Sequence, residues 1–130
     1  GELKFEGIYL YGFRLIGREY IKGRLIYEGD YLYGRKYNGK GYDENGNIIY
    51  ELKDGNGKVK EYHENGNLEF EGELRNGLRD GEGKEYNYKN QLTFSGEYLN
   101  GKRWKGKLIE YDSFLSREFG KEHIITNGEN

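Results

Sequence analysis

The sequence predicts an all-β chain, folded as a single-layer antiparallel meander of tandem β-hairpins. Three observations predict this fold: the composition, an internal repeat, and a period-two alternation of side chains within each repeat. The 130 residues include 22 Gly, 14 Tyr and 6 Phe, and no Pro, Cys or Met. Aromatic residues favour strands, whereas Gly is among the weakest helix formers. A chain of this length is expected to form about one domain.

A frame of ten residues recurs along the chain, and each copy continues into a second half of the type GEGKEY, as in Gly81–Tyr86. The frame reads LEFEGELRNG at Leu68–Gly77 and LTFSGEYLNG at Leu92–Gly101, with further copies at Leu3–Gly12 and Leu25–Gly34 and a weaker one from Ile48 that has Leu52 in place of Gly. The sequence therefore predicts five tandem repeats within residues 1–111, at about 3–24, 25–47, 48–67, 68–91 and 92–111. We expect residues 112–130 to form a degenerate sixth repeat or a cap.

The first half of each repeat alternates with period two. Leu68, Phe70 and Gly72 point to one face, and the Glu residues between them point to the other, which is typical of a half-buried strand. Asn-Gly closes several of these units, and this dipeptide favours the two-residue type I′ hairpin turn. Each repeat then reads strand, turn, strand, turn, so the five repeats predict about ten antiparallel strands in one continuous meander.

Glycines within the strands require their own explanation, because Gly inside a strand marks a bulge or a close approach of another group. The frame places an aromatic residue two positions before its strand Gly, at Phe5, Tyr27, Phe70 and Phe94. We expect each ring to lie across glycines of the neighbouring strand and to replace the missing side-chain contacts. A single, strongly curved layer could then bury its apolar face against its own rings.

The frame F-E-G-E-[YL]-x-N-G followed by G-x-G-K-E-Y resembles the MORN (membrane occupation and recognition nexus) repeat, over residues 3–111. Departures from the motif are Leu52, Val59 and Leu108, each in place of a strand Gly. The resemblance implies an elongated, curved β-sheet shaped like a half-pipe. It also implies a non-catalytic module, since MORN arrays accompany catalytic domains in some lipid kinases and a histone methyltransferase, and occur alone in junction and cytoskeletal scaffolds.

Signals for enzyme chemistry are weak. Three segments fit G-x-x-x-x-G-K, but none continues with the Ser or Thr of a phosphate-binding loop or leads into a helix, and the repeat explains their spacing. Asp43–Asn47 resembles a calcium loop only faintly, and a hairpin turn fits it better. His63 is expected in a solvated connecting loop. We therefore expect no catalytic residues, no metal and no cofactor, and the net charge of −2 argues against a nucleic-acid partner.

Tyrosines supply the first candidate binding surface. Tyr9, Tyr31 and Tyr98 share one repeat position, at which the fourth copy has Leu74. Stacked along the meander they would line one face, where a groove floor of Tyr could anchor a protein partner. The alternative is structural, with these rings serving as the buried layer of a thin sheet.

A basic stretch supplies the second candidate. Lys102 and Arg103 precede Trp104, the only Trp, and this combination suits anionic lipid headgroups; a solvated hairpin loop is the alternative. The function expected is a non-catalytic scaffold that binds a protein partner. The alternatives are a membrane-tethering module that binds anionic lipid, a regulatory arm of a larger enzyme, and an antitoxin- or immunity-like protein. We also expect a homodimer through terminal hairpin edges as one option, and a cytoplasmic location, either free or at the periphery of a membrane or the cytoskeleton.

Overall fold

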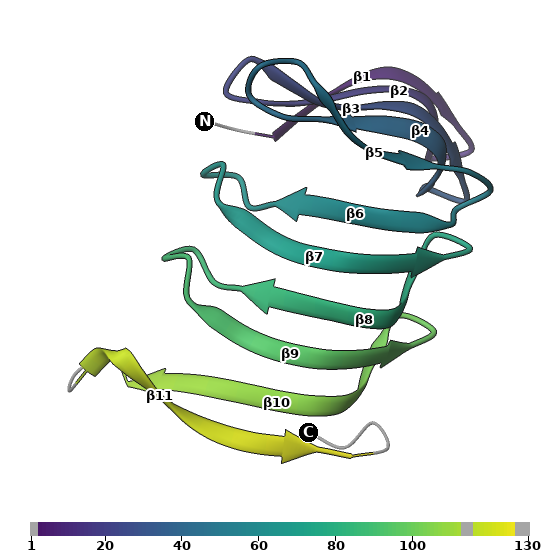
Figure 1. Cartoon of the computed structure of the whole chain (residues 1–130). Coiled ribbons are helices and arrows are strands. Elements are labelled where there is room, and N and C mark those ends of the chain that lie inside the picture. Colours follow the sequence, from purple (N-terminus) through teal and green to yellow (C-terminus); the bar gives the residue numbers. More distant parts are fainter. Residues whose placement is uncertain (1–2, 113–115, 127–130) are drawn as a thin grey trace.

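The computed structural model describes residues 3–112 and 116–126, which contain eleven strands and no helix (Figure 1). The strands follow one another from the N-terminus to the C-terminus as a bowed ribbon that is open at both ends. They are β1 Leu3–Leu10, β2 Phe13–Ile21, β3 Arg24–Leu32, β4 Arg35–Tyr42, β5 Ile48–Leu52, β6 Gly57–Tyr62, β7 Leu68–Arg75, β8 Leu78–Tyr86, β9 Leu92–Leu99, β10 Lys102–Asp112 and β11 Ser116–Ile125. The predicted all-β meander of consecutive hairpins is confirmed.

The meander is divided into two antiparallel sheets, β1–β5 and β6–β11, and this division was not predicted. Every strand pairs with its neighbour in sequence except β5 and β6, which share only the isolated bridge between Lys53 and Asn56. The expected single continuous ladder is therefore interrupted within the third copy. This copy is the one whose frame departs most from the others.

Facing glycines explain both the close packing of each sheet and the place where the ladder stops. In the first sheet Gly7, Gly17, Gly29 and Gly39 face one another in turn, and in the second sheet Gly72, Gly83, Gly96 and Gly106 do the same. A Cβ added at Gly72 would lie 2.5 Å from the carbonyl oxygen of Glu82, so only Gly fits there. Leu52 and Val59 occupy this row on β5 and β6, and both are buried where the two sheets meet.

Aromatic rings cover these glycines, as the sequence predicted. The ring of Phe70 lies 2.7 Å from where a Cβ of Gly83 on the neighbouring strand would stand, and Phe5, Tyr27 and Phe94 lie over Gly17, Gly39 and Gly106 in the same way. Tyr27, Phe70 and Phe94 are fully buried. The third copy differs, because the ring of Tyr50 lies over Gly41, which replaces the Glu found at this position of the first copy.

Two kinds of turn connect the strands. At one end of the strands, two-residue turns have positive φ at both residues, as at Asn76-Gly77 and Asn100-Gly101, which is the geometry of the type I′ turn. Asn38-Gly39 and Asn56-Gly57 are not such turns, as expected, while Asn127-Gly128 lies outside the described residues.

Five-residue loops join β4 to β5, β6 to β7 and β8 to β9 at the other end. Each loop is closed by a backbone hydrogen bond from its first residue to its fifth, as from Asp43 N to Asn47 O at 2.9 Å. The expected solvated position of His63 is wrong. Its ring contacts the Tyr88 ring of the next loop, and its Nε2 lies 2.7 Å from the carbonyl oxygen of Tyr86, so His63 links two successive loops.

The face that carries the rings is the inner face of the bowed ribbon. Leu3 of β1 and Leu74 of β7 line one cavity of about 340 Å³, together with Tyr31 and Tyr50. Strands far apart in the order of the ribbon therefore face the same space. Because side chains alternate along a strand, the residues next to the row of glycines point to the opposite, outer face.

Candidate functional site

Cations on the inner face recur two residues after the turn Gly of four copies. Arg14, Lys36, Arg79 and Arg103 each lie over the ring of the preceding strand, at 4.5, 4.7, 4.0 and 5.2 Å from the centroids of Phe5, Tyr27, Phe70 and Phe94, respectively. Cation–π contacts of this kind contribute about 0.5–2 kcal/mol each. The inner face is therefore layered, with the backbone of the glycines covered by rings and the rings covered by cations.

Carboxylates connect three of these cations, Lys36, Arg79 and Arg103, to the previous copy. Glu19, Glu61 and Glu85 point inward from β2, β6 and β8, and each is bound by the cation of the next even-numbered strand. The distances are 3.7 Å for Lys36–Glu19, 3.2 Å for Arg79–Glu61 and 2.8 Å for Arg103–Glu85. We call this recurring arrangement the Glu–cation relay. The relay was not predicted from the sequence, although the Glu before Tyr and the cation after the turn Gly both recur in the repeat.

Tyr31 and Tyr98 take part in the relay and are buried, with exposed fractions of 5% and 4%. The Tyr31 hydroxyl donates a 2.7 Å hydrogen bond to Glu19, and the Tyr98 hydroxyl donates to Glu85. Burial and the facing carboxylate raise the pKa of both phenols far above the usual range. The structure therefore places these two predicted binding residues in the packed interior, which favours their structural interpretation.

The relay carboxylate Glu85 is held ionised by its partners. Burial alone would raise its pKa, but hydrogen bonds from Arg103 and Tyr98 outweigh burial, so the pKa of Glu85 lies below its usual range. Both oxygens are used by Arg103, whose Nε and Nη2 donate at 2.8 and 2.9 Å. Such a bidentate pair fixes the position of β8 relative to β10.

Tyr9 differs from its two equivalents because 56% of it is exposed. Its ring makes an edge contact with Phe5, with 5.2 Å between centroids. It lies on β1, the first strand of its sheet, so no preceding strand in the described part of the chain covers it. Of the three tyrosines predicted to bind a partner, Tyr9 alone is accessible.

The basic stretch of β10 does not act as one patch. Arg103 points inward to Glu85, whereas Trp104 lies at a β-bulge and is 37% exposed. Lys105 on the outer face forms an ion pair with Glu97 at 3.3 Å, and Lys102 is exposed. Since two of the cations around Trp104 have carboxylate partners, the stretch offers little free positive charge to a lipid headgroup.

Exposed apolar side chains gather at the turn end of the first hairpin, on the outer face. Ile8 faces Ile16 across the strands, and Leu10 faces Phe13, whose ring contacts Tyr33 of the next hairpin. These five residues, each 49–71% exposed, form what we call the apolar edge patch. This patch was not predicted from the sequence. A comparison of the copies would reveal it, because Ile8 stands where other copies have Asp30, Glu73 and Glu97.

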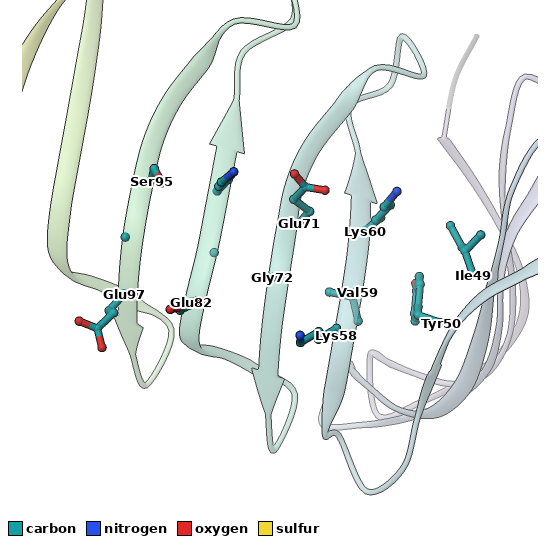
Figure 2. Close-up of a pocket in the computed structure, with 13 residues that line it drawn as sticks. Ile49, Tyr50, Lys58, Val59, Lys60, Glu71, Gly72, Glu82, Ser95 and Glu97 are labelled. Carbon is teal, nitrogen blue, oxygen red and sulfur yellow. The ribbon is translucent and has the colours of Figure 1, made fainter.

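Much of the rest of the outer face is charged, and along one row the signs alternate from strand to strand. One row of facing residues runs Glu6, Arg18, Glu28, Lys40 and Glu51 across the first sheet, and Lys60, Glu71 and Lys84 continue the alternation in the second. A cavity of about 580 Å³ lies over the glycines of the second sheet, between this row and the row that contains Lys58, Glu82 and Glu97 (Figure 2). Its walls include three Lys and three Glu, namely Lys58, Lys60, Lys84, Glu71, Glu82 and Glu97, so it has no net charge with which to select a ligand.

Comparison of the chain with protein-family models, with curated proteins and with solved structures gave no match. The resemblance to the MORN repeat therefore stays a prediction. In the part of the chain that the structure describes, no helix is long and apolar enough to cross a membrane, and no group of three or more His, Asp or Glu side chains is arranged as metal ligands. The accessible features that distinguish one region from the rest are Tyr9 and the apolar edge patch.

Proposed function

We propose that this chain is a non-catalytic β-hairpin repeat module that binds a protein partner through the first hairpin, by means of Tyr9 and the apolar edge patch. The relay residues fix the curvature of the module, and the first hairpin supplies the contact surface. This proposal keeps the scaffold function predicted from the sequence. Of the three tyrosines predicted to bind, it keeps Tyr9, and it adds the apolar edge patch.

The apolar edge patch carries the proposal, because the repeats provide an internal control. In the fifth copy the facing pair equivalent to Ile8 and Ile16 is Glu97 and Lys105, and that copy folds into the same hairpin. The fold thus does not require apolar side chains at these outward positions. Contiguous exposed apolar residues mark interaction sites on protein surfaces, and burial of one Ile side chain contributes about 1.5–3 kcal/mol to association.

Replacement of the pair by the residues of the second copy tests the proposal. The double variant Ile8→Asp/Ile16→Asn introduces the equivalents Asp30 and Asn38, so folding should be retained. The matched control is Glu97→Asp/Lys105→Asn, at the equivalent pair of the fifth copy. Proteins captured from an extract of the source organism by wild type are identified by mass spectrometry and purified, and their affinity for each variant is measured by calorimetry.

We expect a captured protein to bind the wild type and the control with similar affinity, and to bind Ile8→Asp/Ile16→Asn at least about tenfold more weakly, as expected for about 1.4 kcal/mol of lost contact energy. Equal affinity for all three chains would show that the first hairpin is not the contact surface. Binding of the wild type to vesicles that contain anionic lipid, in the absence of any protein ligand, would support the membrane-tethering alternative.

A further inference from the structure

The cavity on the inner face, which we call the inner cavity, lies between the two sheets. Its volume is about 340 Å³, at the lower end of the range for pockets that hold small molecules. Apart from Leu3, the residues that line it come from β2–β7 and from the turns after β3 and β7. The inner cavity is therefore built almost entirely from strands that have a neighbouring strand on each side in the ribbon.

The Glu–cation relay is interrupted at this cavity. In the other four copies a cation lies over the ring of the frame, namely Phe5, Tyr27, Phe70 and Phe94. In the described part of the chain no cation lies over Tyr50, the ring of the third copy, and Gly57 stands at the position of that cation. The carboxylate that would bind it is absent too, because Gly41 stands in its place. The relay thus has a gap between Lys36 of β4 and Glu61 of β6.

The Tyr50 hydroxyl borders this gap and is a buried polar group without a partner. Only 9% of Tyr50 is exposed, and its hydroxyl forms no hydrogen bond with any described residue. Burial raises the pKa of Tyr50 far above its usual range, and the nearby charges of Glu61 and Glu19 raise it further. Both carboxylates line the inner cavity, and neither lines the outer cavity that Tyr50 also borders. Buried polar groups in native proteins nearly always have a partner, so the inner cavity is where we expect one.

The wall that the second sheet contributes has more carboxylates than cations. Three carboxylates share Arg79, at 3.2, 4.0 and 3.9 Å for Glu61, Glu69 and Glu85, respectively. Glu85 has a second cation in Arg103, whereas Glu61 has no other cation among the described residues and uses only its Oε1. Glu69 faces the imidazole of His63 at 3.1 Å. Since Glu61 and Glu69 line the inner cavity, this wall can accept a further positive charge.

The cations that line the opposite wall already have partners or lie in solvent. Arg14 and Lys36 both bind Glu19, at 3.4 and 3.7 Å. Arg35 and Lys60 also line the cavity, and both are exposed. The polar atoms of the interior that have no partner are therefore the Tyr50 hydroxyl and Oε2 of Glu61. Both can accept a hydrogen bond, and the carboxylate can only accept.

We propose that the inner cavity binds an organic cation, a guanidinium or primary ammonium group on a short alkyl chain, in place of the missing relay cation. The charged group donates hydrogen bonds to Glu61 and to the Tyr50 oxygen, and the alkyl chain packs against Ile26 and Leu74, two buried residues that line the cavity. Either a free molecule or an Arg or Lys side chain of another protein can supply this chemistry. The site is distinct from the first hairpin, so it does not depend on the proposed function.

Three probes of similar size and different charge test the proposal. Butylguanidinium, the neutral butylurea and the anionic pentanoate are titrated separately into the intact chain, and backbone amide shifts are recorded by nuclear magnetic resonance. We expect saturable shifts for butylguanidinium, centred on Tyr50, Glu61 and Leu74. Its affinity should exceed that of butylurea at least about tenfold, because a hydrogen bond between two charged groups is stronger than one between a neutral donor and a carboxylate. Pentanoate should bind more weakly still.

Two variants locate the site. Tyr50→Phe keeps the ring and removes the unpartnered hydroxyl, so the fold should be retained and the affinity for butylguanidinium should fall about fivefold or more. The matched control is Tyr86→Phe, because the Tyr86 hydroxyl donates to Glu71 and does not line the inner cavity; its affinity should equal that of wild type. Glu61→Gln should remove most of the preference for butylguanidinium over butylurea. The amide spectrum of each free variant shows whether it is folded.

Several results would overturn the proposal: no saturable shifts at millimolar concentrations, equal affinities for butylguanidinium and butylurea, tighter binding of pentanoate, or unchanged binding in Tyr50→Phe. A further titration with the peptide acetyl-Gly-Arg-Gly-amide separates the two sources of the cation. Tighter binding of the peptide than of butylguanidinium, with shifts at the same amides, would support a side chain of another protein as the occupant. Tighter binding of butylguanidinium would support a free molecule.

Discussion

At the scale of single residues, the facing glycines set how closely the strands approach. The sequence predicted rings over glycines because the aromatic residue and the Gly keep a constant spacing in every regular copy. It did not predict that Tyr31 and Tyr98 would be buried, because their burial depends on Glu19 and Glu85, which come from neighbouring strands. The sequence of one copy does not indicate which carboxylate of the preceding copy will lie beside its tyrosine.

Replacement of a row glycine should be costly. Gly72→Ala would place a Cβ 2.5 Å from the carbonyl oxygen of Glu82 and 2.6 Å from the Cα of Gly83, so the two strands would have to separate. We expect a loss of about 1–3 kcal/mol in the free energy of unfolding, measured by urea denaturation. Gly12→Asn is the control, because no atom lies within 4 Å of its added Cβ and Asn tolerates the positive φ. Equal stability of Gly72→Ala and wild type would contradict the observed register.

Acid should weaken the relay. The pKa of Glu85 is lower in the folded chain than in the unfolded chain, so its contribution to stability is present above the unfolded pKa of about 4.3. That contribution is lost as the pH falls through the folded pKa, because unfolding then takes up a proton. Glu85→Gln should lower stability at pH 7 and reduce its dependence on pH between about 5 and 3. The same slope in both proteins, in urea titrations across that range, would show that Glu85 is not held ionised by Arg103.

At the scale of elements, β5 and β6 meet through packed side chains, whereas the other consecutive strands pair through backbone hydrogen bonds. Here Leu52 and Val59 replace the row glycines, and Gly57 stands where the other copies have the inward cation. The sequence showed Leu52 and Val59 as departures from the motif but could not show their consequence. Their consequence depends on two strands at once, because both side chains are buried against the same core.

Hydrogen exchange should reveal this junction. About half of the amides in β5 and β6 lack a partner in a ladder, as on a sheet edge, whereas β7 and β8 are paired on both sides. We expect those unpaired amides to exchange faster than the amides of β7 and β8 when residues 48–62 and 68–86 are compared by mass spectrometry. Equal protection of the two regions would indicate a continuous ladder between β5 and β6.

At the scale of the whole molecule, the repeat that fixes the fold also identifies the candidate site. The all-β class, the hairpin order and most turns could be predicted, because period-two alternation and Asn-Gly turns are local features of the sequence. The apolar edge patch could have been found by asking which outward positions differ between copies, since Ile8 and Ile16 break a charged row. The exposure of Tyr9 could not have been predicted, because it follows from the place of β1 at the end of a sheet.

The register of the facing glycines is the central claim, since the relay, the inner face and the exposure of Tyr9 on β1 all depend on it. The most direct measurement is a set of nuclear Overhauser effects between Hα atoms of facing strands. The structure predicts strong effects for Gly7–Gly17, Gly29–Gly39, Gly72–Gly83 and Gly96–Gly106, because a Cβ added to the first glycine of each pair would lie 2.6–2.7 Å from the Cα of the second. Strong effects that instead connect each Gly to a residue one or two positions away would contradict the account.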